Sequence, residues 1–120
     1  KIEILQVMVN LLLNAIKAMS DSIDEKKVIT ISTRVIDEKM IKVSVADTGK
    51  GIAETEQDKL FDAFYSLDYN NGLGMGLTIS RRIIEAHEGT IMLENTSKKG
   101  SLFSFMLPMQ SLQLIEDDYE

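Results

Sequence analysis

The stretch Gln6–Ser20, QVMVNLLLNAIKAMS, decides how the rest of the chain is to be interpreted. It is the most apolar run in the sequence, and its pattern predicts a helix that is buried nearly all round. Two asparagines interrupt it, and on a helix Asn10 and Asn14 share one face with Lys17. Buried amides need hydrogen-bond partners. This polar strip therefore either faces a ligand or holds core-edge side chains bonded to neighbouring backbone, and the stretch alone leaves both interpretations open.

The composition is that of one globular domain. The chain has 120 residues, 44% apolar and 27% charged, and a chain of this length can bury a core. It contains no cysteine and one histidine, which excludes disulfides and a multi-histidine metal centre within the chain. No apolar run reaches the roughly 18 residues that cross a bilayer, so we expect a cytoplasmic segment without direct membrane contact, even if the whole protein is membrane-anchored. The net charge of −6 gives no support for nucleic-acid binding.

The order of the other elements predicts the fold class. Four segments alternate with period two or are rich in β-branched residues, and we predict them as strands: Val28–Ile36, Met40–Ala46, Thr90–Glu94 and Ser101–Leu107. Between the two strand pairs, Glu54–Phe64 and Leu77–His87 predict helices, and Tyr65–Gly74 predicts a loop. This order predicts an α+β two-layer sandwich, in which a mixed, mostly antiparallel sheet of about four strands packs on three helices.

Two glycine-rich turns could bring backbone close to a ligand. Asp47–Gly51 (DTGKG) follows a predicted strand, where an aspartate can accept hydrogen bonds from a flat ligand lying on the glycines; a plain Asp-Gly turn is the alternative. Gly72–Leu77 (GLGMGL) runs into a predicted helix, whose N-terminal N–H groups suit phosphate; a flexible hinge is the alternative. The glycine spacing fits neither a dinucleotide-binding fold nor a P-loop.

Taken in order, these stretches resemble the ATP-binding catalytic domain of sensor histidine kinases, within the wider family shared with gyrase and MutL. The stretches that carry the resemblance are Asn10–Ala18 (NLLLNAIKA), Asp47–Gly51, Phe61–Phe64 (FDAF), Gly72–Leu77 and the closing His87–Leu107. The resemblance covers nearly the whole chain up to Pro108. We therefore expect residues 1–108 to be an ATP-binding domain cut from a longer protein and residues 109–120 to be an acidic C-terminal tail.

The resemblance implies that the asparagine strip holds Mg²⁺ and the phosphates of ATP. Asn14, assisted by Asn10, would bind Mg²⁺ through amide oxygens, which suit this hard cation, and Lys17 would contact phosphate. The segment Tyr65–Asn71 would form an ATP lid. The backbone that closes over the phosphates would be that of Gly72, Leu73, Gly74, Met75, Gly76 and Leu77.

The resemblance implies an adenine site at the other glycine turn. Asp47 would accept a hydrogen of the adenine amino group, Gly49 and Gly51 would lie beneath the ring, and Ser101 would support the adenine end. His87 matches a structural histidine of the family and is not expected to be the phosphoacceptor.

The sequence departs from the family pattern in four places. The lid has no lysine or arginine, Ala63 replaces the usual proline, and Asn10 stands where the gyrase relatives have a catalytic glutamate. Without that base, the resemblance favours phosphoryl transfer to a protein over ATP hydrolysis. The strand that precedes the first helix in the family is missing, so five strands become four, and Ser111–Ile115 or another copy of the chain could fill the open edge.

The implied function is transfer of the ATP γ-phosphate to a histidine on a separate dimerisation domain of the same protein, with a response regulator as the next partner. The phosphoacceptor is absent from this fragment, so we assign no catalytic residue and expect no autophosphorylation by the fragment alone. Two alternatives stay open. One is a serine protein kinase of the anti-sigma type, and the other is a degenerate, non-catalytic docking module, which the uncharged lid favours.

Overall fold

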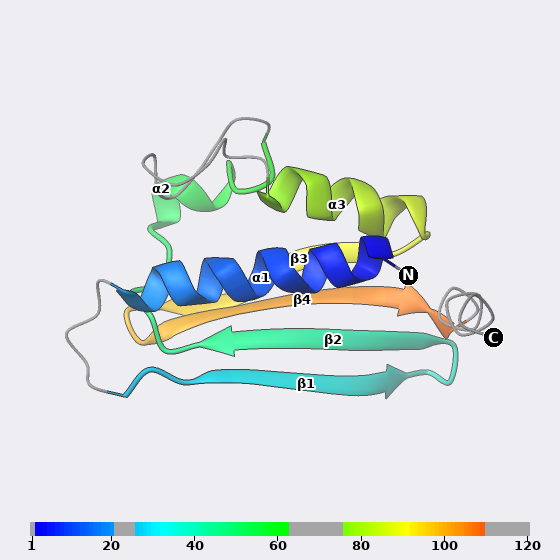
Figure 1. The fold of residues 1–120 in the computed structure, drawn as a ribbon, viewed down its shortest axis with the longest axis horizontal. Helices are drawn as coiled ribbons and strands as arrows, with labels where there is room; N and C mark the ends of the chain where they lie inside the picture. Colours follow the sequence, from blue (N-terminus) through cyan, green and yellow to red (C-terminus); the bar gives the residue numbers. More distant parts are fainter. Residues whose placement is uncertain (1, 21–25, 63–75, 110–120) are drawn as a thin grey trace.

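The computed structural model describes residues 2–20, 26–62 and 76–109, and Figure 1 shows how they are arranged. The described elements are, in chain order, α1 (Ile2–Ser20), β1 (Ile29–Ile36), β2 (Met40–Asp47), α2 (Glu54–Gln57), α3 (Gly76–Ala86), β3 (Thr90–Ser97) and β4 (Gly100–Pro108). All four predicted strands and all three predicted helices are present. The α+β sandwich is therefore confirmed.

The helix α2 is shorter than the predicted Glu54–Phe64. After Gln57 the backbone continues in tight turns, with hydrogen bonds from Lys59 N to the Glu56 oxygen at 3.1 Å and from Asp62 N to the Lys59 oxygen at 3.0 Å. These bonds span three residues, whereas an α-helix needs bonds that span four. The helical pattern of the sequence is thus realised as one turn of helix followed by turns.

The sheet has the strand order β1-β2-β4-β3, and every neighbouring pair is antiparallel. The register places Ile31, Val45 and Phe103 side by side across the first three strands. Because side chains alternate between the two faces of a strand, this row and its equivalents form one apolar face. The outer edge of β1 pairs with no strand among the described residues.

Both long helices lie on the apolar face of the sheet, as Figure 1 shows, with α1 over β2 and α3 over β3. The core fills the space between these two layers. Its buried members are Val7, Leu11, Ala15, Val45, Leu60, Leu77, Ile84, Phe103, Phe105 and Leu107. The sandwich fixes the position of α1 relative to the ends of β2 and β4, which matters for the site below.

The expectation that the first helix is buried nearly all round is wrong. One face of α1 enters the core, but Leu5 is 62% exposed and Ile16 is 53% exposed. The reason is that α1 contacts the sheet on one side and α3 on another, and the remaining sides meet no described element. Among the described elements no helix packs on β1 either, and Ile31 and Val35 are also half-exposed.

The same helix corrects the expectation about membrane-crossing length. By length and composition alone, α1 is apolar enough to span a membrane. The core helix of a globular protein passes the same test. Here one face of α1, with Val7 and Leu11, is buried in the core, whereas Leu5 and Ile16 are exposed.

The sheet face opposite the helices carries a small polar network. The hydroxyl of Ser104 donates to Glu94 Oε2 at 2.9 Å and lies 2.9 Å from the hydroxyl of Ser44. Glu94 also forms an ion pair with Lys42. The hydrogen bond from Lys42, followed by that from Ser104, lowers the pKa of the Glu94 carboxyl. Ser104 is fully buried in this network.

Candidate functional site

Asp47 ends β2 with a carboxyl group whose two oxygens have different surroundings. Its Oδ1 atom accepts hydrogen bonds from Gly49 N at 2.8 Å and from Ser101 N at 3.3 Å. Both bonds go to the same oxygen, so Oδ2 has no hydrogen-bond partner among the described residues. The side chain is nevertheless buried, with 8% of the residue exposed. Oδ2 is therefore an acceptor that the fold holds in place without a donor from the described residues.

Burial raises the pKa of Asp47, and the hydrogen bonds from Gly49 and Ser101 oppose that rise. A raised pKa in the folded state stabilises the fold below the unfolded-state pKa of about 3.9, and that contribution is lost as pH rises through the folded pKa. We expect the free energy of unfolding of the wild type, relative to Asp47→Asn, to fall as pH rises above about 4. Denaturant unfolding of both proteins between pH 3.5 and 7 checks this, and a constant difference would contradict it.

The glycine turn after Asp47 is packed against two other elements. A Cβ atom on Gly49 would lie 2.6 Å from the Ala18 carbonyl oxygen at the end of α1. Gly51 has a φ of +76°, and a Cβ there would lie 1.9 Å from the Ser97 oxygen. Packing thus accounts for both glycines, as the plain-turn interpretation requires. Their implied place beneath an adenine ring stays a prediction.

A pair of hydroxyls supports this end of the site. Ser101 is buried, and its Oγ lies 2.9 Å from Thr96 Oγ1, which accepts a hydrogen bond from Ile52 N at 2.9 Å. The sequence reasoning missed Thr96, because the strand there was predicted to end at Glu94. The signal available was its place opposite Ser101 across the predicted hairpin, which the register confirms.

The polar strip of α1 faces α3. Asn10, Asn14 and Lys17 are half-buried, whereas Gln6, one turn before Asn10 on the same helix face, is exposed. Asn10 Nδ2 donates to the Gly76 carbonyl oxygen at 3.1 Å, which ties the strip to the start of α3. Asn10 is therefore bonded to neighbouring backbone through its nitrogen, while its oxygen has no such bond among the described residues.

Asn14 completes the strip one turn further along α1. Its side chain makes no hydrogen bond that the described part of the structure records. Amide oxygens are suitable ligands for Mg²⁺, which usually takes a few protein ligands and completes its shell with water and phosphate. Two amide oxygens one turn apart fit that role. No cluster of three or more histidine, cysteine or acidic side chains that could hold a metal occurs among the described residues.

The two ends of the predicted lid region are tied together. The hydroxyl of Thr78 in α3 donates to the Phe61 carbonyl oxygen at 3.0 Å. Residues 63–75, which include Ala63, the lid and Gly72, Leu73, Gly74 and Met75, lie outside the described residues. Leu77 is buried in the core, so its backbone N–H, not its side chain, is what could reach a phosphate.

The predicted residues thus gather in two groups along α1. Asp47, Gly49 and Ser101 lie near Ala18, where Lys50 N donates to the Ala18 oxygen at 3.2 Å. Gly76 lies near Asn10. Eight residues of helix separate Asn10 from Ala18, or about 12 Å at 1.5 Å per residue. An elongated ligand with a hydrogen-bonding group at one end and anionic groups at the other suits this arrangement.

His87 lies at the far end of α3. Its Nδ1 atom is 2.8 Å from the Ile83 carbonyl oxygen, and its backbone N–H bonds to the last turn of the helix. Eleven helical residues place it about 16 Å from the start of α3. This position agrees with the structural role expected for it.

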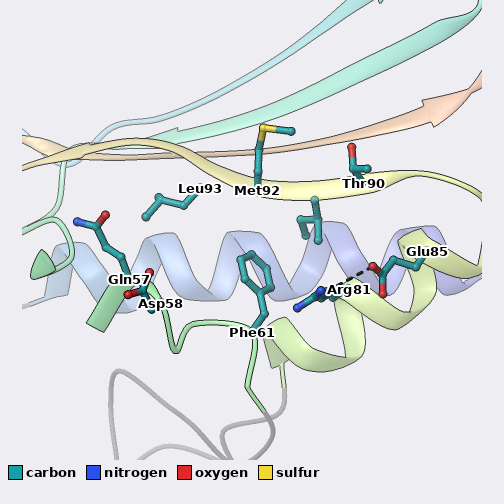
Figure 2. Close-up of a pocket in the computed structure, with 9 residues that line it drawn as sticks. Gln57, Asp58, Phe61, Arg81, Glu85, Thr90, Met92 and Leu93 are labelled. Atoms are coloured by element: carbon teal, nitrogen blue, oxygen red, sulfur yellow. Dashed lines mark hydrogen bonds and ion pairs between the residues drawn. The ribbon is translucent and has the colours of Figure 1, made fainter. Parts of the chain in front are cut away.

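A pocket of about 520 Å³ lies elsewhere, between α2, α3 and β3, and Figure 2 shows it. Its walls include Phe61 and the ion pair of Arg81 with Glu85, whose Nε and Oε2 atoms are 3.5 Å apart. None of the predicted nucleotide-binding residues lines it. It is therefore separate from the candidate site.

Comparison with known proteins gives consistent similarities. Residues 1–111 match the profile of the family described as histidine kinase-, DNA gyrase B-, and HSP90-like ATPases. The sensor protein TdiS of Thauera aromatica is 39% identical over 110 residues, which are 91% of this chain and 20% of that protein. The sensor protein FixL of Bradyrhizobium diazoefficiens is 42% identical over 108 residues, which are 90% of this chain and 21% of that protein. The chain spans about a fifth of the length of these relatives.

Solved structures show the same similarity in three dimensions. The catalytic domain of histidine kinase ThkA, in a nucleotide-free form, superimposes with a TM-score of 0.74 and 36% identity over 88% of this chain and 66% of that one. Full-length ShkA in complex with AMPPNP gives a TM-score of 0.75 and 29% identity over 88% of this chain and 21% of that one.

Proposed function

Because the chain belongs to the family of histidine kinase-, DNA gyrase B-, and HSP90-like ATPases, we propose that it is the Mg·ATP-binding catalytic domain of a sensor histidine kinase. The observation that carries the proposal is that two sets of side chains are held in place near opposite ends of one stretch of α1. Asp47 offers one free acceptor oxygen at one end, and the asparagine strip offers amide oxygens toward the other. The similarity to ShkA, solved with an ATP analogue, supports a nucleotide as the ligand.

In this proposal, the residues bind and orient ATP. Asp47 Oδ2 accepts a hydrogen of the adenine amino group, and Ser101 and Thr96 support that end. Asn14 and Asn10 provide oxygens for Mg²⁺, whose charge offsets that of the phosphates, and Lys17 adds a positive charge near them. The N–H groups at the start of α3 face the phosphates. Catalysis is then mostly positioning and charge neutralisation.

The phosphoryl group moves to a histidine outside this chain. The bond between the γ-phosphorus and its bridging oxygen breaks, a bond from phosphorus to a ring nitrogen forms, and ADP leaves. We propose that the acceptor lies on a dimerisation domain of the same protein, that a response regulator receives the group next, and that the reaction is cytoplasmic. An amide at Asn10 cannot activate water as a base, which favours transfer over hydrolysis.

The proposal predicts which nucleobase the site prefers, and Asp47→Asn tests this preference. Asparagine keeps Oδ1 for Gly49 N and Ser101 N, but replaces the free acceptor by an N–H donor. We expect wild type to bind ATP at least tenfold more tightly than ITP, which has a carbonyl in place of the amino group. The variant should lose about tenfold or more in ATP affinity and reverse the preference, because a misplaced donor leaves both groups unsatisfied.

Isothermal titration with ATP and ITP measures the four dissociation constants. Glu94→Gln is the matched control, because it makes the same chemical change at an acidic group on the opposite sheet face. It should bind both nucleotides as wild type does. A wild type that binds neither nucleotide, or an Asp47→Asn protein with unchanged preference, would contradict the proposal.

A further inference from the structure

Ser80 lies in the second turn of α3 and is fully buried. Its hydroxyl stands between two groups of the candidate site. Ser80 Oγ donates to the Gly76 carbonyl oxygen at 2.8 Å, and it accepts from Asn10 Nδ2 at 3.0 Å. The proposed function gives no role to this serine.

The three groups satisfy one another in only one arrangement. A carbonyl oxygen can only accept, so Gly76 requires donors from both of its partners. Ser80 has a single proton and uses it on Gly76, so its lone pair is left to accept from Asn10. The amide nitrogen of Asn10 therefore has an acceptor for each of its two hydrogens, at 3.1 Å and 3.0 Å.

This arrangement fixes which way the Asn10 amide points. With its nitrogen toward Gly76 and Ser80, its oxygen must face away from both of them. A flipped amide would place that oxygen against the Gly76 carbonyl and leave Ser80 without its donor. The oxygen is the only atom of the amide that can bind a cation.

We infer that Ser80 is a positioning residue, which holds the Asn10 amide with its oxygen toward the metal of Mg·ATP and ties that amide to the start of α3. This inference rests on the proposed function. A simpler account exists, since a serine hydroxyl in a helix often bonds to the carbonyl four residues earlier. That account explains the bond to Gly76 and predicts no effect of Ser80 on Asn10.

Ser80→Ala separates the two accounts, and Ser104→Ala is the matched control. Both serines are fully buried and each has two side-chain hydrogen bonds, but Ser104 lies in the network with Ser44 and Glu94. The two variants should therefore lose similar stability. A change shared by both is a stability effect, whereas a change in Ser80→Ala alone reports on Asn10.

The first measurement uses the protein without nucleotide. The side-chain N–H signals of Asn10, assigned with an Asn10→Asp sample, are followed by NMR for shift and hydrogen exchange. We expect exchange at least about fivefold faster in Ser80→Ala and unchanged in Ser104→Ala, since one of the two acceptors is lost. Identical Asn10 signals in wild type and Ser80→Ala would overturn the inference.

The second measurement is the ratio of AMPPNP dissociation constants without and with Mg²⁺. We expect Ser80→Ala to reduce this ratio about 3- to 10-fold, with affinity in the absence of Mg²⁺ changed less than twofold. Ser80→Cys, which keeps a weak donor and acceptor, should recover part of the loss. In an Asn10→Ala background, Ser80→Ala should change the ratio no further, because the two act through one amide.

The outcomes distinguish this inference from the proposed function. If wild type binds AMPPNP with Mg²⁺ dependence and Ser80→Ala shows the same dependence, the role of Ser80 is wrong and the proposed function stands. If Ser104→Ala lowers the ratio as much as Ser80→Ala, the inference is also overturned. If wild type shows no Mg²⁺-dependent binding, the proposed function is overturned, and the role of Ser80 toward a metal falls with it.

Discussion

Gly51→Ala is expected to destabilise the fold by about 2–5 kcal/mol. The residue has a φ of +76°, where a side chain strains the backbone by roughly 1–2 kcal/mol. The new Cβ would also lie 1.9 Å from the Ser97 oxygen, which is backbone and cannot rotate away. Relieving such overpacking typically costs about 1–3 kcal/mol more. Because the free energy of unfolding of a small domain is only about 5–15 kcal/mol, the variant could lose a large part of its stability.

Denaturant unfolding monitored by circular dichroism measures the effect, with Gly76→Ala as the control. Gly76 has helical backbone, and the only described neighbour that a Cβ there would meet is the Asn10 side chain, at an ordinary contact distance of 3.9 Å. Replacing glycine by alanine in a helix removes freedom from the unfolded chain, so this control should be neutral or slightly stabilising. Equal unfolding free energies for wild type and Gly51→Ala would show that the turn after Asp47 can move.

Asn14→Ala is expected to abolish most of the Mg²⁺ dependence of nucleotide binding. Removing a metal-binding group or its support commonly lowers metal affinity about 10- to 100-fold. We expect the ratio of ATP dissociation constants without and with Mg²⁺ to fall by that amount. Binding without Mg²⁺ should change little, because Asn14 makes no recorded hydrogen bond within the described residues.

Gln6→Ala is the matched control for this prediction. It removes a side-chain amide from the same strip of α1, two turns away and exposed. Titration calorimetry with and without Mg²⁺ should give wild-type values for Gln6→Ala. Unchanged metal dependence in Asn14→Ala would show that the strip does not hold the metal, whatever the fate of the adenine site.

The strands were predictable because each carries its own pattern. Val28–Ile36 and Met40–Ala46 alternate with period two, and the buried apolar side chains of β2 and β4 lie at every second position. A strand buried on one face must repeat every second residue, so the information is local. The turn after β2 was predictable for a similar reason, since Asp47 stands at a strand end beside glycines that the backbone needs.

The exposure of α1 was not predictable from its own residues. The sequence shows that Leu5 and Ile16 are apolar, but burial depends on what else reaches that side of the helix. In the described structure one helix layer covers a sheet of four strands, so part of α1 and the face of β1 are left open. Local pattern gives the tendency to be buried, and tertiary packing decides whether it is satisfied.

Ser80 and Thr96 were missed because neither belongs to a sequence pattern. Each is a single hydroxyl whose role depends on its hydrogen-bond partner. The partner of Ser80 is Asn10, 70 residues away, and that of Thr96 is Ser101, 5 residues away. Pairings of this kind arise only when the helices and strands are placed. For Asn10 the sequence predicted the position on the polar face of the helix, but the direction of its amide is set by Gly76 and Ser80.

The hydroxyl of Thr78 on the Phe61 carbonyl, described above, has a consequence for how such a domain can change over generations. Because it and the bond from Asn10 to Gly76 hold the two borders of residues 63–75 in the folded frame, the frame does not depend on how long the connection is. Loop-closure entropy grows slowly, by about 0.6 kcal/mol for each doubling of length. Insertions and deletions between these borders should therefore cost the fold little stability, so selection can change the length of this connection while the rest of the domain stays as it is.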